Sequence, residues 1–231
     1  MKNKNAARIK RLAITAMLCA LAYALVFLRF SIMPALPFLS YDPKDVVILL
    51  GGFIYGPVTA FAISVVVSFI EMITVGTTGW WGFLMNVIST CALACTASAI
   101  YKFRRSASGA VAALLIGCVA ATGTMVLWNY LITPIYMEGI TRAQIVPMLL
   151  PAFMPFNLIK HSLNTGIFLL VYKPAITALR RAKLLPKSDD SVTAESAALP
   201  FWRRINAGTL LLGLFLLATC ILAILVMKGI I

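Results

Sequence analysis

The sequence predicts an all-α integral membrane protein, in which a bundle of six membrane helices is followed by an extra C-terminal transmembrane helix. Of its 231 residues, 61% are hydrophobic and only 12% are charged, whereas about a quarter of the residues of a soluble domain are charged. The apolar residues gather in runs, several of which approach the 20 or so residues that a helix needs to cross a bilayer. This composition argues against a soluble enzyme, a disordered chain and a secreted disulfide-bonded domain.

The positive charge sets the expected topology. Twenty Lys and Arg against seven Asp and Glu give a formal net charge of +13. In a soluble protein this excess would suggest a nucleic-acid partner, but 15 of the 20 basic residues fall in three clusters, within residues 2–11, 102–105 and 173–204. Loops rich in Lys and Arg stay in the cytoplasm. We therefore expect a multi-pass protein of the cell membrane, with its N-terminus in the cytoplasm, its C-terminus outside, and no nucleic-acid partner.

The crossings follow from the apolar runs between these clusters. Four are expected before residue 102, two between residues 105 and 173, and one near the C-terminus: 12–33, 45–55, 58–73, 82–101, 109–136, 151–172 and 207–227. The break at Gly56-Pro57 is expected because proline lacks a backbone donor and clashes with the preceding turn. Trp80 and Trp81 would anchor the outer interface.

The chain then divides into four parts. A basic N-terminus (1–11) precedes a six-helix membrane domain (12–180), a polar cytoplasmic linker (181–206) and an additional transmembrane helix (207–231).

Polar side chains inside the predicted spans gather in one half of the bilayer. Such groups are costly there and mark candidate functional sites. The topology places them near the outer ends of the helices or on the first outer loop, which fits a small-molecule pocket open to the exterior: Tyr41, Asp42, Asp45, Glu71, Asn86, Asn129, Asn157, Lys160 and Asn164.

Lys160 is the most informative of these residues. It shares one helix face with Asn157 and Asn164, because their spacing is i, i+3, i+7. An ammonium group at this depth needs a partner, which would be an acid such as Glu71, backbone carbonyls or a ligand. The asparagines have a second interpretation, since asparagine also joins membrane helices by hydrogen bonds.

Catalytic chemistry is not indicated. The motifs of serine hydrolases, P-loop NTPases and zinc proteases are missing from the sequence, and one His with scattered Cys gives no metal-ligand spacing. Asp42 and Asp45 would be the acids of a membrane enzyme, but Asp-Pro at residues 42–43 also starts helices. We predict no catalytic residue, no metal and no cofactor, and this enzyme is the less favoured alternative.

The first helix carries a possible partner interface. Ala16, Ala20 and Ala24 follow i, i+4, i+8 spacing, and small residues let another membrane helix approach closely. Alanine is abundant in membrane helices generally, so the stripe alone says little.

Several segments together resemble a known family. They are the alanine stripe, the segment Leu39-Ser40-Tyr41-Asp42-Pro43-Lys44-Asp45 with the following Gly51-Gly52-Phe53-Ile54-Tyr55-Gly56-Pro57, and the segments Gly82-Phe83-Leu84-Met85-Asn86 and Asn157-x-x-Lys160. Over roughly residues 10–180 the chain resembles the substrate-binding S components of energy-coupling factor (ECF) vitamin transporters, most of all the riboflavin-specific ones.

The resemblance implies a subunit that binds riboflavin from outside with high affinity and is not itself an enzyme. It would deliver the vitamin inward together with a transmembrane coupling subunit and two ATP-hydrolysing subunits. Leu39 and Tyr41 would belong to a loop that covers the pocket. The ring edge and ribityl hydroxyls would be bound by Asn129, Asn157 and Lys160, with Asn164, Asn86 and Glu71 as further site residues. The stripe Ala16, Ala20 and Ala24 would dock on the coupling subunit, and lipid would surround the rest.

The predicted polar groups suit riboflavin, which is neutral, planar and rich in hydroxyls. Such a ligand needs apolar walls with a few placed polar groups, and several asparagines with one lysine fit it better than they fit an anion. Alternatives are an S component for folate, thiamine or a queuosine precursor, and a small structural membrane protein without a ligand. The family pattern ends near residue 180, so the helix at 207–227 has no assigned role.

Overall fold

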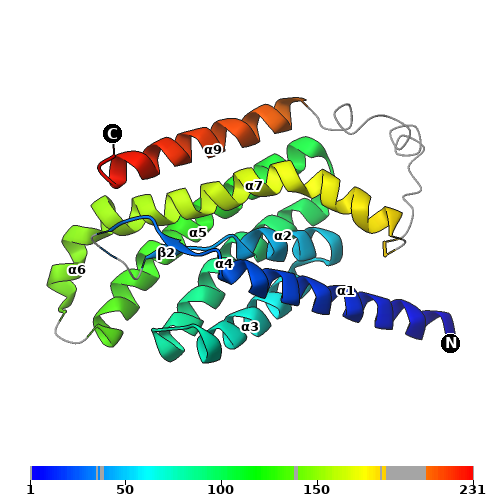
Figure 1. Cartoon of the computed structure of the whole chain (residues 1–231), viewed down its shortest axis with the longest axis horizontal. Helices are drawn as coiled ribbons and strands as arrows, with labels where there is room; N and C mark the ends of the chain where they lie inside the picture. Colours follow the sequence, from blue (N-terminus) through cyan, green and yellow to red (C-terminus); the bar gives the residue numbers. More distant parts are fainter. Residues whose placement is uncertain are drawn as a thin grey trace.

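A computed structural model of the chain describes residues 2–34, 36, 39–137, 140–182, 184–185 and 207–230. They form an all-α bundle with one short strand pair (Figure 1). Six helical stretches in this part of the chain are long and apolar enough to span a membrane. The fold class predicted from composition is therefore confirmed, whereas most of the predicted linker, residues 186–206, lies outside the described residues.

The first helix is displaced relative to its prediction. α1 (Lys2–Val26) takes in the basic N-terminal residues and ends well before residue 33. Its inward face has a period of about one turn, as an amphipathic helix requires, and consists of Ile14, Leu18, Ala22 and Val26.

Residues 27–43, called the α1–α2 segment below, replace the end of the predicted first span. Within it β1 (Phe30–Ser31) pairs antiparallel with β2 (Ser40–Tyr41), and Phe30 lies opposite Tyr41. The segment lies toward the end of the bundle away from the N-terminus (Figure 1).

The corner between α2 (Lys44–Tyr55) and α3 (Pro57–Thr74) lies where the sequence predicts it. Gly56 has φ 96°, a left-handed conformation that glycine adopts without steric cost. Pro57 occupies the first turn of α3, where its missing N–H is harmless. α2 has 12 residues and is buried over most of its length. It is shorter than the 20 or so residues of a standard membrane span, yet it leads from the α1–α2 segment back to the N-terminal end of the bundle, where Arg11 of α1 donates to the Tyr55 carbonyl.

α4 (Gly79–Phe103) and α5 (Ala107–Tyr136) form a long helical hairpin. A short helix, α6 (Arg142–Met148), then leads through a π-helical turn (Leu149–Phe153) into α7 (Met154–Arg181). The predicted sixth span at 151–172 is thus part of a longer helical unit. Its first three residues belong to the π turn, and α7 begins at Met154.

α9 (Ala207–Met227) has the bounds predicted for the last helix. It runs along α7 on the side of the bundle away from α1 (Figure 1). Its C-terminal end lies at the end of the bundle that is opposite to the N-terminus of α1.

Candidate substrate-binding pocket

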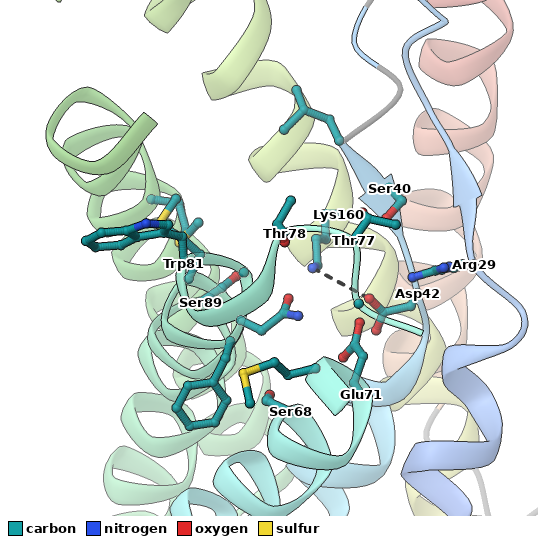
Figure 2. A pocket seen from close by; sticks show the side chains of 18 of the residues that line it. Arg29, Ser40, Asp42, Ser68, Glu71, Thr77, Thr78, Trp81, Ser89 and Lys160 are labelled. Atoms are coloured by element: carbon teal, nitrogen blue, oxygen red, sulfur yellow. Dashed lines mark ion pairs between the residues drawn. The ribbon is translucent and has the colours of Figure 1, made fainter. Parts of the chain in front are cut away.

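An open pocket lies beside the α1–α2 segment, between α3, α4, α5 and α7. The space enclosed by its lining, together with the open space at its mouth, is about 950 Å³. Polar and apolar side chains both line it (Figure 2), among them Arg29, Leu39, Asp42, Ser68, Glu71, Trp81, Phe83, Met85, Asn86, Ser89, Met125, Asn129, Phe156, Asn157 and Lys160.

Most of the predicted binding residues line this pocket. They are Leu39, Glu71, Asn86, Asn129, Asn157 and Lys160. Tyr41 and Asn164 are buried outside the lining, where the Tyr41 hydroxyl donates to Asn164 Oδ1 at 3.0 Å. Asn164 shares the helix face of Asn157 and Lys160 but lies one turn further along α7. These two residues join β2 to α7.

Two pocket asparagines are held by their own helices. Asn157 Nδ2 donates to the Phe153 carbonyl at 2.8 Å, and Asn129 Nδ2 donates to the Met125 carbonyl at 2.7 Å. Thr133 Oγ1 also donates to Asn129 Oδ1 at 3.2 Å. A side-chain amide has two N–H donors and an acceptor with two lone pairs. Both side chains are therefore fixed in orientation and keep hydrogen-bonding capacity for a ligand.

A buried charge cluster forms one wall of the pocket. Lys44, which is 0% exposed, pairs with Glu71 and lies 3.6 Å from Asp42 Oδ2. Lys160 Nζ lies 3.9 Å from the same Asp42 oxygen (Figure 2). Of the partners considered for Lys160, the structure gives Asp42 and not Glu71, because the turn after β2 brings Asp42 between the two lysines.

Asp42 is charged despite its burial. Burial alone would raise its pKa, but the ammonium groups of Lys44 and Lys160, with hydrogen bonds from Lys44, hold the pKa below its usual range. Asp42 lines the pocket, and its Oδ1 is buried without a hydrogen-bond partner. A buried acceptor without a donor costs free energy, so a ligand O–H or N–H would be well placed there. The sequence places Asp42 among the polar residues of an outer pocket, but the family resemblance does not assign it to the vitamin.

Asp45, the other acid of the alternative enzyme hypothesis, joins helices by hydrogen bonds. Asp45 is 0% exposed. Its Oδ1 accepts from Thr90 Oγ1 at 2.7 Å, and its Oδ2 accepts from Asn164 Nδ2 at 3.2 Å. Asp45 thus accepts its hydrogen bonds from Thr90 and Asn164, whereas Asp42 lies against the two lysines. Among the described residues, no group of three or more His, Cys, Asp or Glu side chains is placed to hold a metal ion.

The aromatic part of the lining was missed from the sequence. Of the two predicted interface anchors, Trp80 is 67% exposed, whereas Trp81 lines the pocket (Figure 2). Trp81, Met85 and Ser89 recur every four residues along α4 and all face the pocket. This helical spacing was the available signal.

The alanine stripe lies on the exposed side of α1. Ala16, Ala20 and Ala24 are all exposed, and the buried residues of α1 lie on another face. The three alanines therefore do not pack against other helices of the bundle and remain accessible to a partner.

Comparison with known proteins identifies the family. Residues 10–172 match the family model described as "ECF transporter, substrate-specific component". The chain belongs to this family. Its members are transport components, so the prediction that the chain is not an enzyme is confirmed.

Similar proteins match about three quarters of the chain. The riboflavin transporter RibU of Staphylococcus aureus (strain TCH60) is 30% identical over 183 residues, 77% of this chain and 96% of the relative. The riboflavin transporter FmnP of Bacillus subtilis (strain 168) is 29% identical over 189 residues, 77% of this chain and 99% of the relative. A solved structure of the S component of a bacterial ECF transporter has a TM-score of 0.65 at 28% identity, covering 74% of this chain and 98% of that one. The family match ends before α9 begins.

Proposed function

We propose that this chain is the high-affinity riboflavin-binding component of an ECF-type vitamin importer. It binds the vitamin from outside and delivers it inward together with a coupling subunit and two ATP-hydrolysing subunits. One observation carries the proposal: amide, lysine and aromatic side chains converge on a single pocket in a chain similar over nearly the full length of proteins named riboflavin transporters.

The charges of the pocket favour a neutral ligand. Lys44 and Lys160 are already paired with Glu71 and Asp42, and Arg29 donates to the Val75 carbonyl at 3.0 Å. Folate carries two carboxylates and would need unpaired cations, whereas thiamine is a cation and would need an unpaired acid. Riboflavin needs neither. Its ring suits the walls formed by Trp81 and Phe156, and its hydroxyls suit Asn129, Asn157 and the open oxygen of Asp42.

The membrane arrangement is part of the proposal. The basic ends of α1 and α7 lie at one end of the bundle in Figure 1, which supports a cytoplasmic N-terminus and a pocket that opens outward in the bacterial cell membrane. The C-terminus of α9 would then lie outside. The substrate-binding domain comprises residues 12–180, and α9 (Ala207–Met227) is a helix added to it. The exposed stripe of Ala16, Ala20 and Ala24 is the surface that we assign to the coupling subunit.

The test is the ligand of the purified protein. We expect detergent-solubilised protein to carry the absorption bands of a flavin, and isothermal titration of flavin-depleted protein with riboflavin to give one site per chain. Folate and thiamine serve as comparison ligands. Heat from either of these and none from riboflavin would overturn the assignment of the vitamin.

A further inference from the structure

α9 lies outside the part of the chain that the family match covers. We infer that α9 is a positioning element for the pocket, holding the α1–α2 segment against α7 and thereby slowing the release of the bound ligand. This inference rests on the proposed function only for the identity of that ligand.

α9 is seated on α7 by direct backbone contact. A Cβ atom on Gly213 would lie 3.0 Å from Leu170 Cδ2 and 3.2 Å from the Gly166 carbonyl oxygen. A Cβ atom on Gly166 would lie 3.3 Å from the Gly213 carbonyl oxygen. Paired small residues allow membrane helices to approach this closely. This contact between Gly213 and Gly166, called the seat below, therefore fixes both the distance between the helices and the rotation of α9 about its axis.

The rotation turns one face of α9 toward the α1–α2 segment. Beyond the seat, this face continues at spacings of four and three residues and consists of Leu217, Cys220, Ile224 and Met227. It belongs to one apolar cluster with Ile32, Leu39 and Tyr41 of the α1–α2 segment and Phe156, Ile159 and Leu163 of α7. Cys220 and Ile224 are 6% and 9% exposed, whereas Ile221 is 54% exposed.

The C-terminal end of α9 reaches the strand pair itself. Lys228 Nζ lies 5.7 Å from the centre of the Phe30 ring in β1. That ring lies 5.3 Å from the Tyr41 ring in β2, and the Tyr41 hydroxyl is bonded to Asn164 of α7. Contacts thus run without a gap from α9 through both strands to α7. Leu39, next to β2, lines the pocket, so this chain of contacts ends at the site.

The strand pair needs such support. Each strand has two residues, and an isolated pair of strands is marginally stable at best. A segment with few buried contacts opens locally at low free energy. The apolar face of α9 belongs to the same buried cluster as Ile32, Leu39 and Tyr41 of this segment, and contacts that hold a covering segment in place act mainly on the dissociation rate of the ligand.

Matched variants of the full chain test the inference. Ile224→Ala truncates a buried side chain of the apolar cluster that α9 shares with the segment, and Ile221→Ala makes the same change on the exposed face. Gly213→Leu disturbs the seat, and Ala218→Leu adds the same side chain at an exposed position. Lys228→Gln removes the contact with Phe30 at the surface, where misfolding is not a concern.

Two measurements are made on each variant. The first is deuterium uptake by backbone amides 30–41 in riboflavin-free protein. The second is the dissociation rate of riboflavin followed by fluorescence. We expect Ile224→Ala and Gly213→Leu to raise both rates about fivefold or more, Lys228→Gln to raise them about twofold, and the two exposed-face controls to match the unaltered protein.

The outcomes separate this inference from the proposed function. If the unaltered protein binds no riboflavin, the proposed function fails, while deuterium uptake still decides the role of α9. If Ile224→Ala matches Ile221→Ala, and Lys228→Gln matches the unaltered protein, in both deuterium uptake and dissociation rate, α9 does not position the segment.

Discussion

The two ends of the bundle bury opposite kinds of side chain. At the pocket end, charges and amides are enclosed, with Asp42, Lys44 and Glu71 among them. At the other end, aromatic rings from α2, α4 and α7 fill the interior. Phe53 stacks on Tyr101 at a centroid distance of 4.4 Å and lies 4.7 Å from Phe168.

This difference indicates that one end of the bundle binds the ligand and that the other end stabilises the fold. Buried charges and partly satisfied polar atoms cost free energy unless they are paired. The polar groups that a ligand can use therefore lower the stability of the pocket end. The aromatic end has interlocking rings and is closed by packing. Substitutions at the pocket end should therefore change affinity or leave charges unpaired, and those at the aromatic end should change stability alone.

Lys44→Met should have the largest effect. It leaves Glu71 without its partner and Asp42 with only Lys160, and removal of one partner of a buried pair costs about 3–5 kcal/mol. We expect a loss near the upper end of this range in the free energy of unfolding, measured by denaturation in detergent. Lys102→Met at an exposed position is the control. The double variant Lys44→Met/Glu71→Leu should recover part of the loss, and an absence of recovery would contradict the pairing.

Phe168→Ala tests the aromatic end. Phe168 is 1% exposed and touches Phe53 and Tyr172, so its truncation should cost about 3–4 kcal/mol of unfolding free energy. The riboflavin affinity of the folded fraction should not change, because the residue lies outside the pocket. Val171→Ala, at a position that is 43% exposed, should change neither quantity. A tenfold weaker affinity in Phe168→Ala would remove the distinction between the two ends.

The features of the fold that could be predicted from the sequence are those that neighbouring residues determine. The corner at Gly56-Pro57 was predicted because the chemistry of two neighbouring residues determines it, and α9 because its apolar run has no interruption. The end of α1 was misplaced, since residues 27–33 are as apolar as a helix would be and yet cover the pocket as a strand and loop. Apolarity alone does not separate these states.

The site shows the same division. The outer depth of Asn129, Asn157 and Lys160 followed from topology, and all of them line the pocket. The partner of Lys160 could not be predicted, because Asp42 reaches it only through the tertiary path of the α1–α2 segment. Asn164 was expected in the site because it shares a helix face with Lys160, but one further turn carries it below the pocket to Tyr41 and Asp45.

Substitutions of single polar side chains at the pocket end should separate affinity from stability. Asn157→Ala and Lys160→Ala should each weaken riboflavin binding by about 1–3 kcal/mol, the cost of leaving a buried polar partner unpaired. Asn164→Ala should instead lower the free energy of unfolding, because it releases Tyr41 and Asp45. Titration calorimetry and denaturation of the same three proteins measure both effects. If Asn157→Ala and Lys160→Ala both bind riboflavin unchanged, they do not belong to the site.

The smallest expected effect concerns the wall that Trp81 contributes. A flavin bound against Trp81 should quench its fluorescence, whereas Trp80, at 67% exposed, points away from the pocket. Trp81→Phe keeps an aromatic wall, so the affinity should fall by less than about 1 kcal/mol, in the range of one aromatic pair, while most of the ligand-dependent quenching disappears. Trp80→Phe should retain the quenching. The reverse result would mean that the flavin ring lies nearer to Trp80 than to Trp81, and that Trp81 is not part of its binding wall.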